Sequence, residues 1–471
     1  MTVMIPFDNS FARLPGAFYT SQGPEPVKAP RLVAFNRDLA RVLGVEGDEA
    51  DLAQVFGGNA LPEGASPLAQ LYSGHQFGQY NPQLGDGRAV LLGEVVGRDG
   101  VRRDIQLKGS GRTPYSRMGD GRAWLGPVLR EYVVSEAMFA LGVPTTRALA
   151  AVETGERVVR EDVWPGAVLT RVAQSHLRVG TFQIFAARQD VASLRQLTEY
   201  AIQRHYPDAD GPMGLLRAVR GAQAELIAAW LSVGFVHGVM NTDNSSIAGE
   251  TIDYGPCAFL DTYHPNTVFS SIDQFGRYAY GNQGDIAVWN LAQLATALIR
   301  QMDDPEAAVE EATEIVHAMP EMIQVAWRAR FGAKIGIVSP EAQDEGLVQD
   351  LLAQMAEDGA DFTNTFRALG DGTARDQLTD RDRFAAWETR WQARIAREAD
   401  PQVVMRGANP AFIARTHRLE AMISAAVNGD YAPFERLMTV LARPFEDQPE
   451  AADLRAPPMP SEVVPATFCG T

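Results

Sequence analysis

Apolar and polar positions first form a clear pattern in two short runs near residue 100. The runs "AVLLGEVV" (89–96) and "RRDIQLK" (102–108) flank a Gly-Arg-Asp-Gly turn, and this order predicts a β-hairpin. A loop rich in Gly and Arg, "GSGRTPYSRMGDGR", follows the second strand. Apolar residues then recur at helical spacing, which predicts a helix from about Trp124 to Leu141 that ends at "GVP".

Helical periodicity dominates the rest of the chain. After a region of strands and turns at 145–170, the pattern predicts helices near 191–205, 213–235, 285–301, 305–330, 342–357 and 410–440. The longest apolar run, Leu226 to Met240, is too short for a membrane span and contains His237, so it predicts a buried helix that runs into a loop. Residues from about 443 onward are rich in Pro and acid and predict an extended tail.

Composition places the chain among ordinary soluble proteins. Its 471 residues are enough for two or three lobes, and 46% are hydrophobic and 21% charged. The N-terminus lacks the features of a secretory signal, so we expect a cytoplasmic protein that does not associate with membranes. A formal net charge of −17 argues against binding to nucleic acid.

Cysteine and lysine are both rare. The two cysteines, Cys257 and Cys469, cannot form a Cys-rich zinc site. So few cysteines are consistent with a protein of the reducing cytosol. Lysine occurs only at Lys28, Lys108 and Lys334, whereas Arg supplies the other basic residues. Lys108 ends a predicted strand, where a compact point charge could serve a function that the planar Arg side chain does not reproduce. Chance retention of a surface lysine is the alternative.

Several well-known signatures are absent from the sequence. No lysine follows a Gly as the Walker motif requires, and Pro114 stands where the dinucleotide fingerprint needs a Gly. The chain also lacks a G-x-S-x-G elbow and an H-E-x-x-H helix. These absences argue against P-loop NTPases, α/β-hydrolases and zincins.

The remaining candidate residues follow one another in the order that is found in kinase-like folds. There a Gly-rich turn covers nucleotide phosphates, a strand Lys pairs with a helix Glu, and a loop Asn and a later Asp hold the metal ion. Carboxylate and amide oxygens suit Mg²⁺, and Lys and Arg suit phosphate. The candidates along this chain are a Gly-rich turn with Arg88, then Lys108, Glu131 or Glu136, His237 to Asn244, and Asp253-Tyr-Gly.

The loop after the apolar run departs from the kinase pattern. Kinase-like phosphotransferases often carry H-G-D-x-x-x-x-N, with the Asp as base. Here His237, Gly238 and Asn244 are in register, but Val239 replaces that Asp, and an acid occurs instead at Asp243. The change removes the usual base and leaves the nucleotide and metal ligands in place, so ordinary phosphoryl transfer is in doubt.

Four long blocks in the same order resemble the selenoprotein O family of pseudokinase-fold protein adenylyltransferases. They are "YSGHQFGQYNPQLGDGRA", "QLKGSGRTPYSRMGDGRA", "LTRVAQSHLRVGTF" and "HGVMNTDNSSIAGETIDYGP", and they span residues 72–256. The resemblance implies an α+β, two-lobed, protein-kinase-like fold with a strand-rich N-lobe and a helical C-lobe. We expect an N-terminal extension at 1–60, the N-lobe at 61–165, the C-lobe at 166–442 and a Pro-rich tail at 443–471.

The resemblance also implies a reaction. ATP would bind in reverse relative to a kinase, and AMP would pass to Ser, Thr or Tyr hydroxyls of proteins, the chain itself being one candidate acceptor. Mg²⁺ or Mn²⁺ would assist the transfer of AMP. The positive charge of two arginines seven residues apart in "TRVAQSHLR", with Lys108 and Arg88, fits a buried pyrophosphate leaving group.

The family's roles carry over to matching positions of this chain. Asp243 would be the catalytic base, and Glu131 would pair with the strand lysine. Asn244 and Asp253 would hold the metal ion. The nucleotide would contact Gly85, Gly87, Arg88, Lys108, Asp120, Gly121, Arg171, Arg178 and Asp253.

Some alternatives stay open from the sequence. Helical spacing from Leu125 places Glu136, not Glu131, within the apolar stripe. Asp86 and Asp120 each stand in a Gly-Asp-Gly turn, where Asp is favoured for local hydrogen bonding alone. His75 and His176 are expected to be structural.

The function itself also has alternatives. A kinase that uses Asp243 as a displaced base and a non-catalytic nucleotide-binding pseudokinase are the two we keep. Cys469 occupies a position where some family members carry selenocysteine, which suggests redox regulation. We expect a monomer.

Overall fold

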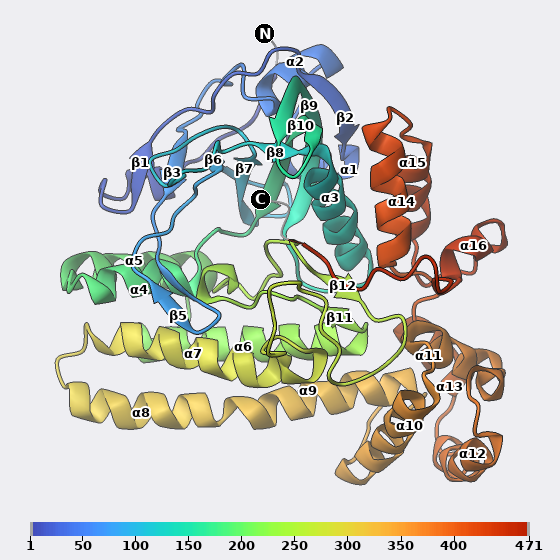
Figure 1. Ribbon diagram of the computed structural model, residues 1–471. Coiled ribbons are helices and arrows are strands. Elements are labelled where there is room, and N and C mark those ends of the chain that lie inside the picture. Colours follow the sequence, from blue (N-terminus) through green and yellow to red (C-terminus); the bar gives the residue numbers. More distant parts are fainter. Residues whose placement is uncertain (1–2, 469–471) are drawn as a thin grey trace.

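An eight-stranded antiparallel sheet forms the upper part of the structure, a computed structural model that describes residues 3–468 (Figure 1). Seven strands follow one another across the sheet, and β8 (Ala123–Trp124) pairs with β10 beside this path. The order is β1 (Tyr19–Ser21), β3 (Leu68–Gln70), β6 (Ala89–Val96), β7 (Arg102–Lys108), β10 (Val163–Ala173), β9 (Arg147–Val159) and β2 (Arg31–Phe35).

The predicted hairpin and the helix that follows it are confirmed. Strands β6 and β7 have the predicted bounds and pair in the register Ala89 with Lys108 and Val96 with Arg102. Helix α3 (Leu125–Ala140) begins and ends one residue inside the predicted limits. The hairpin thus places Lys108 at the last position of β7, between Ala89 of β6 and Leu169 of β10.

Both faces of the sheet are covered. Successive strand residues point to opposite faces, and along β10 Val168 packs with α1 (Arg37–Leu43) and α2 (Glu49–Phe56), whereas Leu169 packs with α3. Because α3 has an apolar side against the sheet, its acidic residues are held at fixed positions. On its other side α3 contacts the late helices α14 (Thr416–Val427) and α15 (Ala432–Leu441).

The remaining helices lie below and beside the sheet (Figure 1). Helix α6 packs against α7 and α9, and this layer supports the short strands and loops that meet the sheet. The helices are α4 (Val179–Ala187), α5 (Val191–His205), α6 (Gly211–Ser232), α7 (Gln283–Ile299), α8 (Pro305–His317), α9 (Met319–Lys334), α10 (Glu345–Asp358), α11 (Phe362–Asp371), α12 (Arg381–Ile395), α13 (Pro401–Ala408) and α16 (Ala452–Arg455).

Short elements complete the part of the chain that the structure describes. Two small two-stranded sheets are also present: β4 (Gly74–Gln76) pairs with β5 (Gln79–Asn81) in a hairpin, and β11 (Phe235–Val236) pairs with β12 (Ala258–Phe259). The 3-10 turns are η1 (Phe11–Arg13), η2 (Thr242–Asn244), η3 (Tyr280–Asn282), η4 (Ala342–Asp344), η5 (Ala374–Gln377) and η6 (Pro449–Ala451).

Two predicted helices are each divided in the structure. The pattern at 305–330 gives α8 and α9, because Pro320 lies in the first turn of α9 and begins a new helix. The pattern at 410–440 gives α14 and α15, which are separated at Gly429, a residue with φ of +88°. Helices α1, α2, α4 and α11 to α13 were not predicted.

The tail is extended over most of its length, as predicted, but it contains η6 and α16. Near its end Thr467 hydrogen-bonds to the loop at 269–271. The division at residues 60, 165 and 442 stays a prediction; β1 and β2 belong to the sheet, and β10 continues past residue 165. No helix within residues 3–468 is long and apolar enough to cross a membrane.

Candidate functional site

A cavity of about 590 Å³ lies where the end of the sheet meets the loops of the helical part. It is lined by every residue predicted to contact the nucleotide or the metal ion and by the predicted base. They are Gly85, Gly87, Arg88, Lys108, Asp120, Gly121, Arg171, Arg178, Asp243, Asn244 and Asp253. Residues up to 168 positions apart in the sequence therefore share one concave surface, which is the usual form of a small-molecule site.

The first Gly-Asp-Gly turn is pressed against the loop that contains Tyr115. A Cβ atom added to Gly85 would lie 2.6 Å from the Tyr115 ring, and one added to Gly87 would lie 2.9 Å from the Tyr115 carbonyl oxygen. Gly85 also has φ of +118°, which a residue with a side chain rarely adopts. Glycine is required here for close packing, and the turn leaves its backbone on the cavity wall.

Asp86, in the same turn, is more than a turn residue. Its carboxylate is buried and accepts hydrogen bonds from the backbone N–H of Gln70 and from Nε2 of Gln106, both at 3.1 Å. Nη1 of Arg178 lies 3.5 Å from Oδ1 of Asp86. This carboxylate helps to fix Arg178, a role that the sequence did not reveal because the two residues are 92 positions apart.

Three cations converge on Asp253. Nζ of Lys108 lies 2.8 Å from Oδ1 of Asp253, and Nη1 of Arg171 lies 2.5 Å from the same oxygen. Nη2 of Arg178 lies 3.7 Å from Oδ2. The arginine side chains are only 2% exposed. Three cations thus lie together on the cavity wall, paired with the carboxylates of Asp253, Glu131 and Asp86, and low solvent access strengthens these ion pairs.

Burial alone would raise the pKa of the Asp253 carboxyl, but the charges of Arg171, Lys108 and Arg178 hold that pKa well below its usual range. Asp253 has φ of +63°, an uncommon conformation for a residue with a side chain. The preceding residue is fixed, because its carbonyl oxygen lies 2.8 Å from Nε2 of buried His237. His237 therefore braces the strained backbone at Asp253.

Helix α3 supplies Glu131, not Glu136, as the partner of Lys108. Oε2 of Glu131 lies 2.5 Å from Nζ of Lys108, and Oε1 lies 3.3 Å from Nη1 of Arg171. Glu136 lies one turn further along and forms an ion pair with Arg147 at 2.7 Å. Glu136 lies in the apolar stripe of the helix, as its spacing from Leu125 predicted, and its ion pair with Arg147 does not involve the cavity.

Asp243 is held in a buried position under the β4–β5 hairpin. Its Oδ2 accepts a hydrogen bond of 3.0 Å from Nε2 of Gln76, whereas Oδ1 has no hydrogen-bond partner among the described residues. Burial raises the pKa of the Asp243 carboxyl to about 6. A Cβ atom added to Gly74 would lie 2.8 Å from Oδ1 of Asp243, so this glycine leaves space for the carboxylate.

The same hairpin orders the rest of the loop that contains Asp243. The backbone N–H of His75 donates to Oγ1 of Thr242 at 2.7 Å, and that of Phe77 donates to Oδ1 of Asn241 at 3.1 Å. Residues 74–81 lie in the first of the four sequence blocks, but the sequence alone did not show which loop they cover. Gln76 is the functional candidate that was missed for this reason.

The second Gly-Asp-Gly turn belongs to the cavity wall mainly through its backbone. The Asp120 carboxylate forms an ion pair with Arg160 at 2.9 Å and accepts a hydrogen bond from the backbone N–H of Arg122. The hydrogen bond from Arg160 is the main reason that the pKa of Asp120 is lowered. Gly121 has φ of +69° and packs against the backbone of Gly111, so a side chain has no room there.

Two side chains of the cavity suit a divalent metal ion. Nδ2 of Asn244 donates to the carbonyl oxygen of Val239 at 3.1 Å, which leaves Oδ1 of Asn244 for a ligand. Asp253 supplies a carboxylate. No cluster of three or more His, Cys, Asp and Glu side chains that could hold a metal ion occurs within residues 3–468. The donor set thus suits a cation that also uses phosphate oxygens and water, as Mg²⁺ commonly does.

The other histidines of the sequence blocks are structural, as expected. Nδ1 of His176 lies 2.8 Å from Oδ2 of Asp104, and the ring is fully buried. Nδ1 of His75 lies 2.9 Å from Nε2 of Gln183, and its ring packs against Trp289. Cys469 lies outside the described residues, so its proposed redox role stays a prediction.

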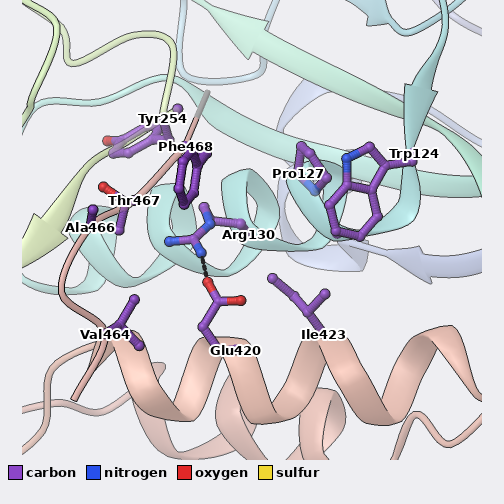
Figure 2. Close-up of a pocket in the computed structure, with 12 residues that line it drawn as sticks. Trp124, Pro127, Arg130, Tyr254, Glu420, Ile423, Val464, Ala466, Thr467 and Phe468 are labelled. Atoms are coloured by element: carbon purple, nitrogen blue, oxygen red, sulfur yellow. Dashed lines mark hydrogen bonds and ion pairs between the residues drawn. The ribbon is translucent and has the colours of Figure 1, made fainter. Parts of the chain in front are cut away.

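A second cavity, of about 240 Å³, lies between α3, α14 and the C-terminal segment (Figure 2). Arg130 of α3 and Glu420 of α14 form an ion pair inside it, and Phe468 lies beside Tyr254. Residues 464–468 therefore pack close to the Asp-Tyr-Gly segment. None of the residues predicted to bind the nucleotide lines this cavity.

The geometry of the larger cavity is suited to an anionic ligand with several phosphate groups. Its closed end holds three cations, its walls include two Gly-rich turns with accessible backbone, and its floor carries two carboxylates and an amide. Asp243 also lines this cavity, with its Oδ2 atom held by Gln76 and its unpaired Oδ1 atom buried.

Comparisons with known proteins agree with this picture. A family model described as "Protein adenylyltransferase SelO" matches residues 2–442. A protein of Ruegeria pomeroyi named "Protein nucleotidyltransferase YdiU" is 73% identical over 472 residues, covering 100% of both chains. Proteins of the same name from Ruegeria sp. and Roseobacter denitrificans are 72% and 66% identical, again over 100% of both chains.

Proposed function

Because the chain belongs to the SelO family and is therefore a protein nucleotidyltransferase, we propose that it transfers AMP from ATP to Ser, Thr or Tyr hydroxyl groups of proteins. The reaction forms a bond between the acceptor oxygen and the α-phosphorus and breaks the bond from that phosphorus to the bridging oxygen. Pyrophosphate leaves with the bonding electrons. A two-lobed, kinase-like architecture, with the sheet in one lobe and α4 to α13 in the other, is part of this proposal.

The observation that carries the proposal is the burial of the three cations at the closed end of the cavity. Lys108 is 12% exposed and Arg171 and Arg178 are 2% exposed, so an anion must enter deeply to reach them. A pyrophosphate leaving group carries more charge than any other part of ATP and would be stabilised there. ATP would then bind with its γ-phosphate buried and its α-phosphate toward the cavity mouth.

Asp243 would accept the proton from the acceptor hydroxyl group. Asp243 lines the cavity, and its buried carboxyl group has one oxygen, Oδ1, without a hydrogen-bond partner in the described part of the chain. Gln76 holds the other oxygen and thereby fixes the direction of the carboxylate. General-base assistance of this kind contributes about 10²- to 10⁴-fold to a rate.

Asn244 and Asp253 would hold a divalent metal ion, Mg²⁺ or Mn²⁺, which would neutralise phosphate charge when bound. Glu131 has a positioning role. It orients Lys108 and Arg171 by its two oxygens and so keeps both cations pointed into the cavity. Gly85, Gly87, Arg88, Asp120 and Gly121 would contribute the surrounding wall.

The proposal is tested by transfer of label from ATP that carries the label on either the α- or the γ-phosphate. Purified protein is incubated with each ATP, with Mg²⁺ or Mn²⁺ and with a mixture of acceptor proteins. We expect protein-bound label only from the α-position, and we expect it to be lost in Asp253→Ala. Asp303→Ala removes an acid whose side chain is 96% exposed and serves as the matched control.

The alternatives predict other results in the same experiment. Label from the γ-position alone would show a kinase and refute the reversed orientation of ATP. ATP binding without any transfer would favour a non-catalytic pseudokinase. Thermal unfolding of Asp253→Ala in the absence of ATP shows whether that variant is folded.

A further inference from the structure

Two hydrogen-bonded turns at the mouth of the 590 Å³ cavity expose large apolar side chains to solvent. Met118 and Phe275 are each 96% exposed, more than any other large apolar residue described. Arg117 and Gly119, which flank Met118, line the cavity, and so does Ile272, which is 58% exposed. Exposed apolar residues gathered at one place on a surface commonly mark an interaction site.

The turn that exposes Phe275 has a defined structure. Asp273 is buried, and its carboxylate accepts hydrogen bonds from the backbone N–H groups of Arg277 at 2.9 Å and Tyr278 at 2.8 Å. The guanidinium group of Arg277 lies 4.8 Å from the centre of the Trp289 ring. These contacts hold both ends of the turn, so Phe275 is presented outward by a fixed backbone.

The turn that exposes Met118 is fixed in a similar way. The backbone N–H of Gly119 donates to the carbonyl oxygen of Ser116 at 2.8 Å, and Oγ of Ser116 accepts from the backbone N–H of Thr113 at the same distance. The Ser116 hydroxyl group also donates to the carbonyl oxygen of Gly87, which connects this turn to the first Gly-Asp-Gly turn. Arg117 has φ of +54°. The fold thus maintains a strained conformation that places Met118 in solvent.

Charge is also distinctive at this rim. The chain has a formal net charge of −17, yet Arg112 and Arg117 are both exposed and form no ion pair with any residue between 3 and 468. Unpaired arginines beside exposed apolar residues match a partner that is both apolar and acidic. Arg is also enriched among the residues that dominate binding at protein interfaces.

We propose that these two turns grip an extended segment of the acceptor protein. The segment would place large apolar side chains on either side of its hydroxyl group, against Met118 and Phe275, and an acidic residue further out, near Arg112 and Arg117. This inference rests on the proposed function, since it uses Asp243 as the point that the hydroxyl group must reach. It deepens that function by naming the chemical class of the acceptor.

The test uses nine-residue peptides with a central Ser, Thr or Tyr. In one set Leu flanks the hydroxyl residue and Glu lies further out; in the second Ser replaces Leu, and in the third Lys replaces Glu. Transfer of α-label from ATP gives kcat/KM for each peptide. We expect wild-type protein to prefer the first set over the second by at least about tenfold, the effect of burying one or two apolar side chains.

In the variant Met118→Ser/Phe275→Ser, the ratio of kcat/KM for the Leu peptides to kcat/KM for the Ser peptides should fall close to one. The affinity for ATP should not change. Both side chains are exposed, so their loss does not affect the core. Met459→Ser is the matched control, because Met459 is 60% exposed and does not line the cavity. Its ratio should equal that of the wild type. A wild-type ratio near one, or an unchanged ratio in the double variant, overturns the inference.

Binding of fluorescent peptides in the presence of a non-hydrolysable ATP analogue separates this inference from the proposed function. A preference for the Leu set without any α-label transfer would refute the proposed function and keep the docking surface. Transfer that ignores the flanking residues would refute the docking surface alone. Sedimentation that shows a wild-type dimer and a monomeric double variant would instead assign the two turns to contacts between copies of this chain.

Discussion

Lys334 is one of only three lysines in the chain, and it is buried at the end of α9 with 1% of its surface exposed. Its Nζ atom lies 4.4 Å from the centre of the Phe366 ring and 5.2 Å from that of Phe362, and burial lowers the pKa of the amine from its ordinary 10.5 to about 7. Replacing this lysine with Met, which has a similar length and no charge, should therefore stabilise the protein near neutral pH.

The sign and the size of the stabilisation expected for Lys334→Met follow from the linkage between proton binding and folding. The unfolded chain binds a proton at Lys334 below about pH 10.5, whereas the folded chain does so only below about pH 7. The contribution of Lys334 to stability therefore becomes more unfavourable as pH falls from 10 to 7 and changes little below about pH 6. The penalty is about 4 kcal/mol at pH 7 and under about 1 kcal/mol at pH 10. Attraction of the charged amine to the two rings acts in the opposite direction, so this penalty is an upper value.

The assay is urea unfolding of wild type and Lys334→Met at pH 7 and pH 10, at constant ionic strength. The variant should gain about 2–4 kcal/mol at pH 7, and most of that gain should vanish at pH 10. Lys28→Met is the matched control because Lys28 is exposed, and its effect should be small at both pH values. A gain for Lys334→Met that is equal at pH 7 and pH 10 would refute the reasoning.

Three further predictions concern the larger cavity. Arg178→Met removes a cation that is fixed by Asp86, and α-label transfer should fall by about 10²- to 10³-fold. Glu131→Gln should lower kcat/KM with little change in melting temperature, whereas Glu136→Gln should do the reverse, because only the first acid pairs with the cations of the cavity. Gly74→Ala places a Cβ atom 2.8 Å from Oδ1 of Asp243 and should lower kcat more than it raises KM; an unchanged kcat would remove the case for the catalytic base.

The lysines illustrate how far sequence reasoning extends. Rarity singled out all three, but it could not distinguish Lys108 in the cavity from the buried Lys334 or the exposed Lys28. The distinction depends on what surrounds each amine after folding. Lys108 was singled out because a predicted strand, a Gly-rich loop and a helix followed one another around it; the structure has those elements with nearly the predicted bounds, and Lys108 lines the cavity.

Local sequence patterns did not predict the roles of residues whose contacts lie far away in the sequence. Gln76 and Asp86 act on Asp243 and Arg178, and each pair is separated by more than 90 residues. No periodicity or turn motif encodes such a contact. Most of the missed helices are short: α11 has 10 residues and α13 has 8, so their stability comes mainly from packing and their pattern covers only two or three turns.

Asp253 connects the cations that would bind phosphate with the proposed metal site. The three cations that would bind the phosphates of ATP are all paired with this one carboxylate, which is also the proposed metal ligand. Phosphate oxygens would compete with the carboxylate oxygens of Asp253 for the N–H donors of these cations, and this competition would loosen the hold on the carboxylate. Charge therefore links the two proposed sites: nucleotide entry would make Asp253 available to a metal ion, and a metal ion on Asp253 would free the cations for the phosphates. The strained backbone at Asp253 and the burial of Arg171 and Arg178 keep the three cations within reach of either partner.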